Sequence, residues 1–581
     1  MSLDIARLVA FTGISTTELQ ISVASSNISN ADTKGYTQKT ADQVADVTGG
    51  IGTGVSITGI SSNVDKLLLK SLIAANSDLG AADTTNSYLT QLQQLFGSAS
   101  TSGTSTTGTS LANSLASLES ALSSLASSPS SVSLQSAAVS ALDDFASQLR
   151  STSSSVQTLR GNADKDIASS VQSVNDDLKQ ISDLNVEIRK MAASGQSTAD
   201  LEDERNSALQ DLSSYMNVSY YTASNGDLQV YTSSGRALVD SSAHTLSYTA
   251  SANISASSSF SGIMVDGVDV SSQITSGKIG SLITLRDDTL PAVQTQLDQL
   301  ASQLKSALNG ITEGASAVPP PTTLTGTASV SSTTGLSASG TVRIAAVDQS
   351  GNLASSYDFD LSGYSTVGDL VADINAKNIG VTASIDSNGH LALTATATGN
   401  GVAVNDMTSS LGGTDFSGYF GINDLVTGSS AADFAVNKSI LSGSAGLPTG
   451  TLDSSASLTS GSQVLTSGSA TVINALYDKL TGSTSFKAAG GLSATTGSFA
   501  DYAAAIVANV ASKASQASSD YTAKSTAQSS YASSLSSQSG VNVDEETARL
   551  SSLQNKYAAA SQLIAVVNSM FSSLLTAVQS T

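Results

Sequence analysis

The most constraining feature of the sequence is a regular apolar seam near its C-terminal end. From residue 543 to residue 578, apolar residues recur at alternating spacings of three and four, and only Glu546 breaks the series. This spacing is the heptad pattern of a coiled coil. Asn542, with Glu545 three positions later, resembles a capping box that would begin the helix. The residues that we assign to an assembly seam are Leu550, Leu553, Tyr557, Ala560, Ile564, Val567, Phe571, Leu574 and Val578.

A narrow apolar stripe on a helix needs a second helix to cover it, because exposed apolar surface costs about 25 cal/mol per Å². Residues 3–29 are predicted to be helical and are the natural partner. Their own stripe is ragged, since Glu18 and Ser25 interrupt it. We therefore expect both ends to finish their packing against neighbouring subunits, with an ordinary intramolecular bundle as the alternative.

The interior of the chain changes character several times. Turn-forming residues at 30–36 predict the end of the first helix, and residues 62–214 read as helical with a Ser/Thr/Gly break at 97–110. The best helical segment runs from Ile167 to Ile188, and Asn185 is the one polar member of its stripe. Period-two patterns around Asn225-Gly226 and Asp266-Gly267 then predict two hairpins.

These patterns predict a multidomain α+β protein. Long antiparallel terminal helices would form a coiled coil and a helical bundle, with β-rich domains inserted in the middle of the chain. We expect a terminal coiled-coil domain from 1–40 and 541–581; a helical bundle domain from 41–215, 281–315 and 496–540; a β-rich domain from 216–280 and 406–495; and a small inserted α/β module at 324–405.

Composition excludes several classes of function. The 581 residues carry a net charge of −22 without any Lys/Arg cluster, which argues against nucleic-acid binding. There is no Cys, and the two histidines, His244 and His390, lack any motif of metal or catalytic spacing. We expect no catalytic residue, no metal and no cofactor. No secretory signal pattern is visible. No uninterrupted apolar run is long enough to span a membrane, so we expect no membrane span.

Residues 24–37, with the sequence ASSNISNADTKGYT, resemble the N-terminal signature of flagellar rod, hook and hook-associated proteins. Its motif residues here are Asn27, Ile28, Asn30, Gly35 and Tyr36. Residues 539–546 resemble the matching C-terminal motif, and residues 201–206 and 277–287 resemble internal segments of the hook-associated protein 1 family. The module at 335–405 is similar to the small inserted domain of flagellins and filament-capping proteins.

The resemblance implies a structural junction protein of the bacterial flagellum, exported through the flagellar type III apparatus and placed outside the cell. It implies self-association in a helical or annular assembly, with hook protein, hook-associated protein 3 and a flagellar export chaperone as partners. The loop at 30–36 would then contact neighbouring subunits as well as end a helix.

Three alternatives remain. Another axial component, such as hook protein or flagellin, would share the terminal motifs. An exported enzyme would hide its catalytic insert in residues 406–495, and turnover that is lost on substitution of Asp424 or Asp433 would support it. A Ser/Thr-rich surface adhesin would need a signal and an anchor.

Overall fold

A computed structural model describes residues 2–97, 110–466 and 468–579 of the chain. The chain divides into two compact units, each assembled from separate stretches. Unit 1 comprises residues 1–88, 161–286 and 515–581, and unit 2 comprises residues 89–160 and 287–514. The predicted break at 97–110 falls mostly on residues 98–109, which lie outside the described residues.

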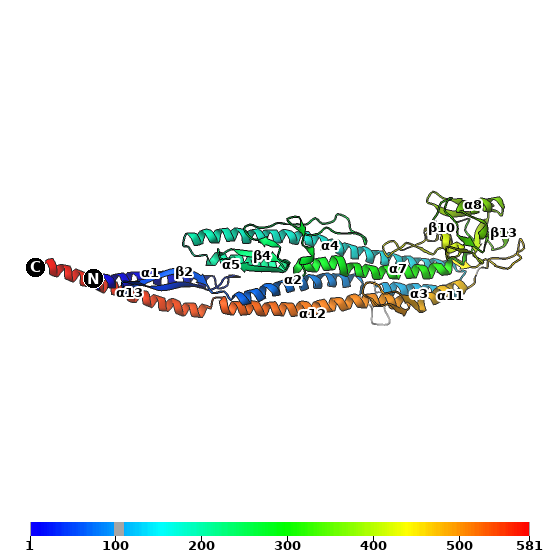
Figure 1. The fold of residues 1–581 in the computed structure, drawn as a ribbon. Helices are drawn as coiled ribbons and strands as arrows, with labels where there is room; N and C mark the ends of the chain where they lie inside the picture. The colour runs from blue at the N-terminus through cyan, green and yellow to red at the C-terminus, as the bar shows by residue number, and fades with distance from the viewer. Residues whose placement is uncertain (1, 98–109, 467, 580–581) are drawn as a thin grey trace. The chain divides into compact units, whose positions relative to one another are not determined.

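The two terminal helices of unit 1 pack against each other. The first helix, α1 (Ser2–Ser29), lies along the last helix, α13 (Val543–Gln579), and the two run antiparallel (Figure 1). Contacts at both ends fix this direction: the Arg7 guanidinium lies 5.9 Å from the centre of the Phe571 ring, and Gln38 contacts Glu546. The predicted pairing of the chain's two ends is confirmed.

A β-hairpin that the sequence analysis missed covers another face of α1. Strands β1 (Lys39–Thr48) and β2 (Ile51–Ser62) pair antiparallel from Lys39 opposite Ser62 to Thr48 opposite Ile51, with two register shifts. Gly49 and Gly50 form the turn with φ values of +61° and +81°. Residues that carry a side chain rarely adopt this backbone conformation. We had assigned this stretch to the helical bundle. The Gly-Gly pair between two β-branched segments was the available signal.

The rest of unit 1 is helical with two small sheets. Helix α5 (Ala199–Tyr215) and helix α6 (Gly277–Thr284) contact each other, and residues from α2 (Lys66–Leu95), α4 (Val132–Ala193) and α12 (Phe499–Ser539) complete the unit. One sheet contains β3 (Val218–Thr222), β4 (Leu228–Thr232) and β5 (Ala237–Val239). The other contains β6 (Leu246–Ser247), β7 (Met264–Val265) and β8 (Val268–Asp269). Both predicted hairpins are confirmed, because β3 pairs with β4 and β7 pairs with β8.

Unit 2 combines helices with several short sheets. Its longer helices are α3 (Leu111–Ser127), α7 (Leu290–Thr312), which follows a single π-helical turn at Leu285–Thr289, and α11 (Thr471–Thr481); shorter ones are α8 (Val367–Ala376), α9 (Phe416–Phe420) and α10 (Lys438–Leu441). Its strands are β9 (Ser316–Ala317), β10 (Thr323–Ser329), β11 (Ala338–Ser339), β12 (Thr341–Asp348), β13 (Leu353–Asp360), β14 (Val381–Ile385), β15 (His390–Ala395), β16 (Asn400–Asn405), β17 (Ser410–Leu411), β18 (Val426–Thr427), β19 (Ala435–Val436), β20 (Pro448–Gly450), β21 (Thr484–Phe486) and β22 (Thr495–Gly497).

The central strand β12 of unit 2 is buried on both faces. It pairs with β13 on one side and with β16 on the other. Val342, Ile344 and Ala346 point into the larger core, which also holds α8, while Ala345 and Val347 pack into a second core with residues from 452–465. Because successive side chains of a strand point to opposite faces, one strand serves both cores.

The predicted fold class is confirmed: the protein is α+β, its terminal helices pack together, and its middle is rich in β-structure. Within unit 1, α2 also lies beside α12, where Lys524 pairs with Asp78 at 2.6 Å and Gln528 donates to Asn76 at 3.1 Å. The predicted domain boundaries stay a prediction.

Candidate functional site: the terminal helices

The predicted seam of α13 forms most of the face that packs on α1. Leu553 and Val567 are buried, at 4% exposure each, and Leu550, Ala560, Ile564 and Phe571 are half-buried at the same helical spacing. We call these six residues the inner stripe. Tyr557, Leu574 and Val578 belong to the predicted series but are exposed, at 39%, 55% and 67%. The pairing with α1 thus covers only part of the seam within one chain.

A second apolar stripe on α13 lies to one side of the inner stripe and is largely exposed, and it was not predicted from the sequence. Leu563, Val566 and Met570 are 46%, 56% and 51% exposed, and we call them the outer stripe. Their spacing of three and four places them on one helix face. Helix α1 adds Leu8 and Phe11, at 48% and 64% exposure, near the same end of the helix pair. The pair therefore presents apolar surface that its own chain leaves exposed.

The residues of the N-terminal motif end α1 and fold the following loop back onto it. Asn27 is fully buried, and its side-chain amide donates to the Lys39 carbonyl at 2.9 Å while its oxygen accepts from the Lys39 N–H at 3.0 Å. The Tyr36 hydroxyl donates to the same Asn27 oxygen at 3.0 Å. Gly35 has a φ of +82°, a conformation that glycine adopts without strain.

The two remaining motif residues act more locally. The Asn30 side chain donates to the Ser26 carbonyl at 3.0 Å, within the last turn of α1. Ile28 is half-buried. The loop at 30–36 is a helix stop, as expected, and its contact with neighbouring subunits remains a prediction.

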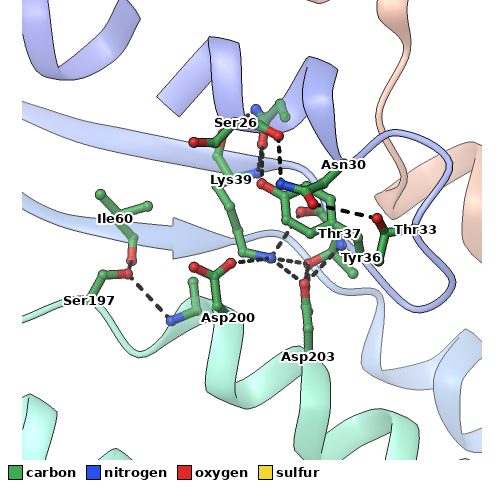
Figure 2. A network of polar contacts seen from close by, with 12 residues as sticks. Ser26, Asn30, Thr33, Tyr36, Thr37, Lys39, Ile60, Ser197, Asp200 and Asp203 are labelled. Carbon is green, nitrogen blue, oxygen red and sulfur yellow. Dashed lines mark hydrogen bonds and ion pairs between the residues drawn. The ribbon is translucent and has the colours of Figure 1, made fainter. Parts of the chain in front are cut away.

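A buried ion pair holds this loop against α5. The Lys39 ammonium contacts Asp203, and both side chains are almost completely buried (Figure 2). Asp203 also accepts hydrogen bonds from the Thr37 N–H at 2.8 Å and from the Thr37 hydroxyl at 2.7 Å. Asp200, one turn earlier on α5, lies 3.5 Å from the Lys39 nitrogen but is exposed. Because both charges are paired and further hydrogen-bonded, their burial is tolerated.

The environment of Tyr36 follows from the same cluster. Burial raises the pKa of the Tyr36 hydroxyl to about 12, and the carboxylates of Asp200, Asp203 and Glu546 add to the effect. The Lys39 ammonium also lies 4.1 Å from the centre of the Tyr36 ring. Tyr36 therefore stays protonated and acts as a hydrogen-bond donor at any physiological pH.

Gln38, two residues after Tyr36, joins the loop to the C-terminal segments. Its N–H donates to the Ser539 carbonyl at 2.8 Å, at the end of α12. Its side-chain amide donates to the Glu546 carboxylate at 2.6 Å, in the first turn of α13. Glu546, the one polar member of the predicted seam, is 1% exposed and therefore sits inside the packed face. We call Asn27, Tyr36, Thr37, Gln38, Lys39, Asp203 and Glu546 the polar anchor.

Arg205, in the internal segment at 201–206, holds a second part of unit 1. Arg205 donates to the Asn185 side-chain oxygen and to the Gly226 carbonyl, each at 2.8 Å. Asn185 in turn accepts from the Leu228 N–H and donates to the Leu228 carbonyl, both at 2.9 Å. The polar break in the stripe of α4 therefore holds the β3–β4 hairpin, while Asp203 holds the N-terminal loop.

The part of the chain that the structure describes holds no group of three or more His, Cys, Asp or Glu side chains arranged to bind a metal. His244 lies 2.8 Å from Asp266, and His390 lies 3.5 Å from Asp386. Asp424 accepts a hydrogen bond from Thr327. Asp433 accepts hydrogen bonds from the N–H groups of Ser429 and Ser430. These contacts stabilise turns and packing.

One stretch of the described residues meets a length and hydropathy criterion for a membrane span. Within Phe499–Gln579, an 18-residue window has a mean hydropathy of 1.4, and 6% of it is buried. The sequence predicts no membrane span. A single helix of this kind is weak evidence for a membrane span, because core helices of soluble proteins satisfy the same criterion.

Four family models match the chain. The flagellar hook-associated protein FlgK helical domain matches residues 82–317, and the flagellin hook IN motif matches residues 341–397. The model for flagella basal body rod protein matches residues 8–37, and the C-terminal model of the flagellar basal body rod FlgEFG proteins matches residues 532–577. The rod matches cover most of the terminal helices and four residues of the polar anchor: Asn27, Tyr36, Thr37 and Glu546.

Curated relatives show the same similarity. Flagellar hook-associated protein 1 of Escherichia coli K12 is 24% identical over 313 residues, which are 52% of this chain and 55% of that protein. The protein of the same name from Salmonella typhimurium is 23% identical over the same shares. The chain thus spans about half the length of the curated relatives it matches. The solved structure of the flagellar hook junction protein FlgK from Burkholderia pseudomallei has a TM-score of 0.46 and 17% identity, and the match covers 80% of this chain and 98% of that one.

The paired terminal helices and the rod-protein motifs on them define an axial structural protein of the bacterial flagellum. The FlgK helical domain between those motifs makes the assignment more specific. The chain belongs to the FlgK family of flagellar hook-associated proteins. This is a structural family of the flagellum, not an enzymatic one.

Proposed function

We propose that the protein is the structural junction between hook and filament and that it assembles through its terminal helices. One observation carries this proposal: α1 and α13 pack on each other through the inner stripe while the outer stripe stays exposed. A helix pair that satisfies one apolar face and exposes another suits stacking beside further helices. Copies of the same chain would form a helical or annular layer.

The remaining partners follow from the family. We infer that hook protein lies on one side of the layer, hook-associated protein 3 lies on the other, and an export chaperone shields α13 before assembly. The protein would reach its place through the flagellar type III apparatus. The seam from Leu550 to Val578 would complete its packing at contacts between subunits, where Tyr557, Leu574 and Val578 are still exposed.

A substitution in the outer stripe tests the assembly route. Val566→Ser with Met570→Ser removes apolar surface that is already exposed, so the free energy of unfolding should change by less than about 0.5 kcal/mol. Cells that carry only this variant should lose motility and shed filaments. Ala565→Ser is the matched control, because Ala565 is exposed on the same helix outside the outer stripe. Normal swimming with the double variant would refute assembly through this face.

The location of the protein separates the junction from its alternatives. Antibody labelling of purified flagella should mark the boundary between hook and filament. Label along the whole hook or filament would favour another axial component. Recovery in the membrane fraction without flagellar label would favour a membrane anchor, and label over the cell surface would favour an adhesin.

A further inference from the structure

A regular apolar seam does not by itself fix how two helices slide along each other. The inner stripe repeats every seven residues, so shifting α13 by one heptad along α1 brings similar apolar residues into register again. Such a shift is about 10.5 Å at 1.5 Å per residue.

Polar contacts between fixed points can supply the register that the seam lacks. Asn27 bonds both backbone groups of Lys39, so α1 moves together with the start of β1. Between these residues, Gln38 bonds the Glu546 carboxylate at 2.6 Å, so α1 is connected to one specific turn of α13. Both connections lie at the same end of the helix pair.

Glu546 occupies a position where a leucine would extend the apolar seam. Its carboxylate is buried: one oxygen accepts from Gln38 at 2.6 Å and lies 3.6 Å from the Arg549 guanidinium, and the other oxygen lacks a hydrogen-bond partner within the described residues. A side chain chosen for stability alone would be apolar here, because a half-satisfied buried carboxylate is costly. Single buried polar residues in coiled coils are known to specify register at a cost in stability.

We propose that Glu546, held by Gln38, is the positioning residue that sets the register of α13 on α1. A slip by one heptad in either direction would move Glu546 away from Gln38, and a slip toward the start of α1 would also place its carboxylate against the apolar face of α1. The polar anchor thus specifies one alignment of a helix pair that is otherwise free to choose among several.

Cross-linking between engineered cysteines tests this register directly, because the chain has no cysteine of its own. The in-register pair is Arg7→Cys with Phe571→Cys, since these two side chains contact each other. The shifted pairs are Arg7→Cys with Ile564→Cys and Arg7→Cys with Val578→Cys, one heptad to either side. A short bifunctional thiol reagent is applied to the full chain at high dilution, and intramolecular products are quantified.

We expect the in-register product to dominate in the parent chain. In the Glu546→Leu background, the ratio of in-register to shifted product should fall about tenfold, which is the factor for about 1.4 kcal/mol. Helix content should stay unchanged. Glu545→Leu is the matched control, because Glu545 is an exposed neighbour in the same turn, and it should preserve the parent ratio. The double variant Gln38→Glu with Glu546→Gln exchanges the two side chains, and its ratio of in-register to shifted product should return to the parent value.

Several outcomes would overturn the proposal. An unchanged ratio in Glu546→Leu means that the seam itself sets the register. Loss of all three products means that Glu546 is needed for pairing rather than for alignment. If Glu546→Leu does not fold, Gln38→Leu decides by the same ratio. A parent chain that cross-links equally at shifted positions also refutes the idea.

Discussion

At the residue scale, the departures from apolar periodicity turn out to be the informative positions. Glu546 interrupts the seam of α13 and Asn185 interrupts the stripe of α4, and each bonds a segment distant in sequence. The sequence shows that these residues break a pattern. It does not show their partners, because Gln38 and Leu228 come close only after the chain has folded.

The buried ion pair of Lys39 and Asp203 gives the first prediction. Asp203→Asn would leave the Lys39 ammonium buried with only neutral hydrogen-bond partners nearby and the exposed Asp200 at 3.5 Å. Removing one partner of a buried pair costs about 3–5 kcal/mol. Urea unfolding of the full chain should show a loss near the lower end of that range.

Asp200→Asn is the matched control for this prediction, since Asp200 is 79% exposed in its side chain. Exposed ion pairs contribute about 0–1 kcal/mol, so this variant should unfold almost as the parent does. Equal effects of the two substitutions would show that the polar anchor does not depend on the buried pair.

Gly35 gives the second prediction. An added Cβ would meet only the Ser207 side chain, at 3.6 Å, so space is available and the backbone conformation decides. Gly35→Ala should destabilise the protein by about 1–2 kcal/mol, which is the cost of a left-handed conformation for an L-residue. Thermal unfolding measures the loss.

The comparison is Gly13→Ala inside α1, where a Cβ meets nothing within 4 Å. Alanine in a helix interior is about 0.5–1 kcal/mol better than glycine, so this variant should be more stable than the parent. Destabilisation by both alanines would contradict the assignment of strain to residue 35.

At the element scale, the sequence predicted the long periodic helices correctly, but it predicted only some of the short β-hairpins. The seams of α4 and α13 and the turns at Asn225-Gly226 and Asp266-Gly267 identified their elements correctly. The β1–β2 hairpin was missed because its exposed face carries Val44, Val47 and Ile51, so polar and apolar residues do not alternate cleanly. The outer stripe was not predicted because it has only three residues, whereas the heptad series on the neighbouring face of α13 is much longer.

The end of α7 gives a prediction of pH dependence. Burial raises the pKa of the Glu313 carboxyl to about 7, and nearby Asp424 and Asp415 add to the effect. Since this pKa lies above the unfolded value of about 4.5, the folded chain binds more protons than the unfolded chain between these values. The contribution of Glu313 to stability is therefore present below about pH 4.5 and is lost as the pH rises to 7.

Glu313→Gln removes this titration. The midpoint of thermal unfolding should rise by about 2 °C at pH 8 and change little at pH 4.5, relative to the parent at the same pH. Calorimetry at the two pH values measures the difference. A variant that is stabilised equally at both would show that the charge of Glu313 is not responsible.

At the scale of the whole molecule, the pairing of the chain's ends changes how self-assembly should be pictured. The sequence predicted that the two ends pair and that both finish their packing against neighbouring subunits. The structure pairs α1 with α13 within one chain, and of the described side chains of α13 only Glu546, Leu553 and Val567 are buried. The pair of helices thus buries few side chains within one chain. Assembly would cover the apolar surface that remains exposed.

This thin packing predicts protease sensitivity in the isolated chain. Residues 1–40 and 541–581 should be cut before the rest of the protein, because helices with few buried contacts open at low free-energy cost. Limited proteolysis of the dilute full chain, followed by mass spectrometry, identifies the sites. Equal resistance of the ends and the interior would contradict assembly-dependent completion of the terminal helices.

The discontinuous make-up of unit 1 has a consequence for how the protein is made. Its three stretches, 1–88, 161–286 and 515–581, are separated by the residues of unit 2. A ribosome that has synthesised five hundred residues has therefore released α1 without α13, and Gln38 without Glu546. The apolar face of α1 therefore stays without its partner helix during most of translation. Although α1 is synthesised before α13, it can complete its packing only after α13 has been synthesised.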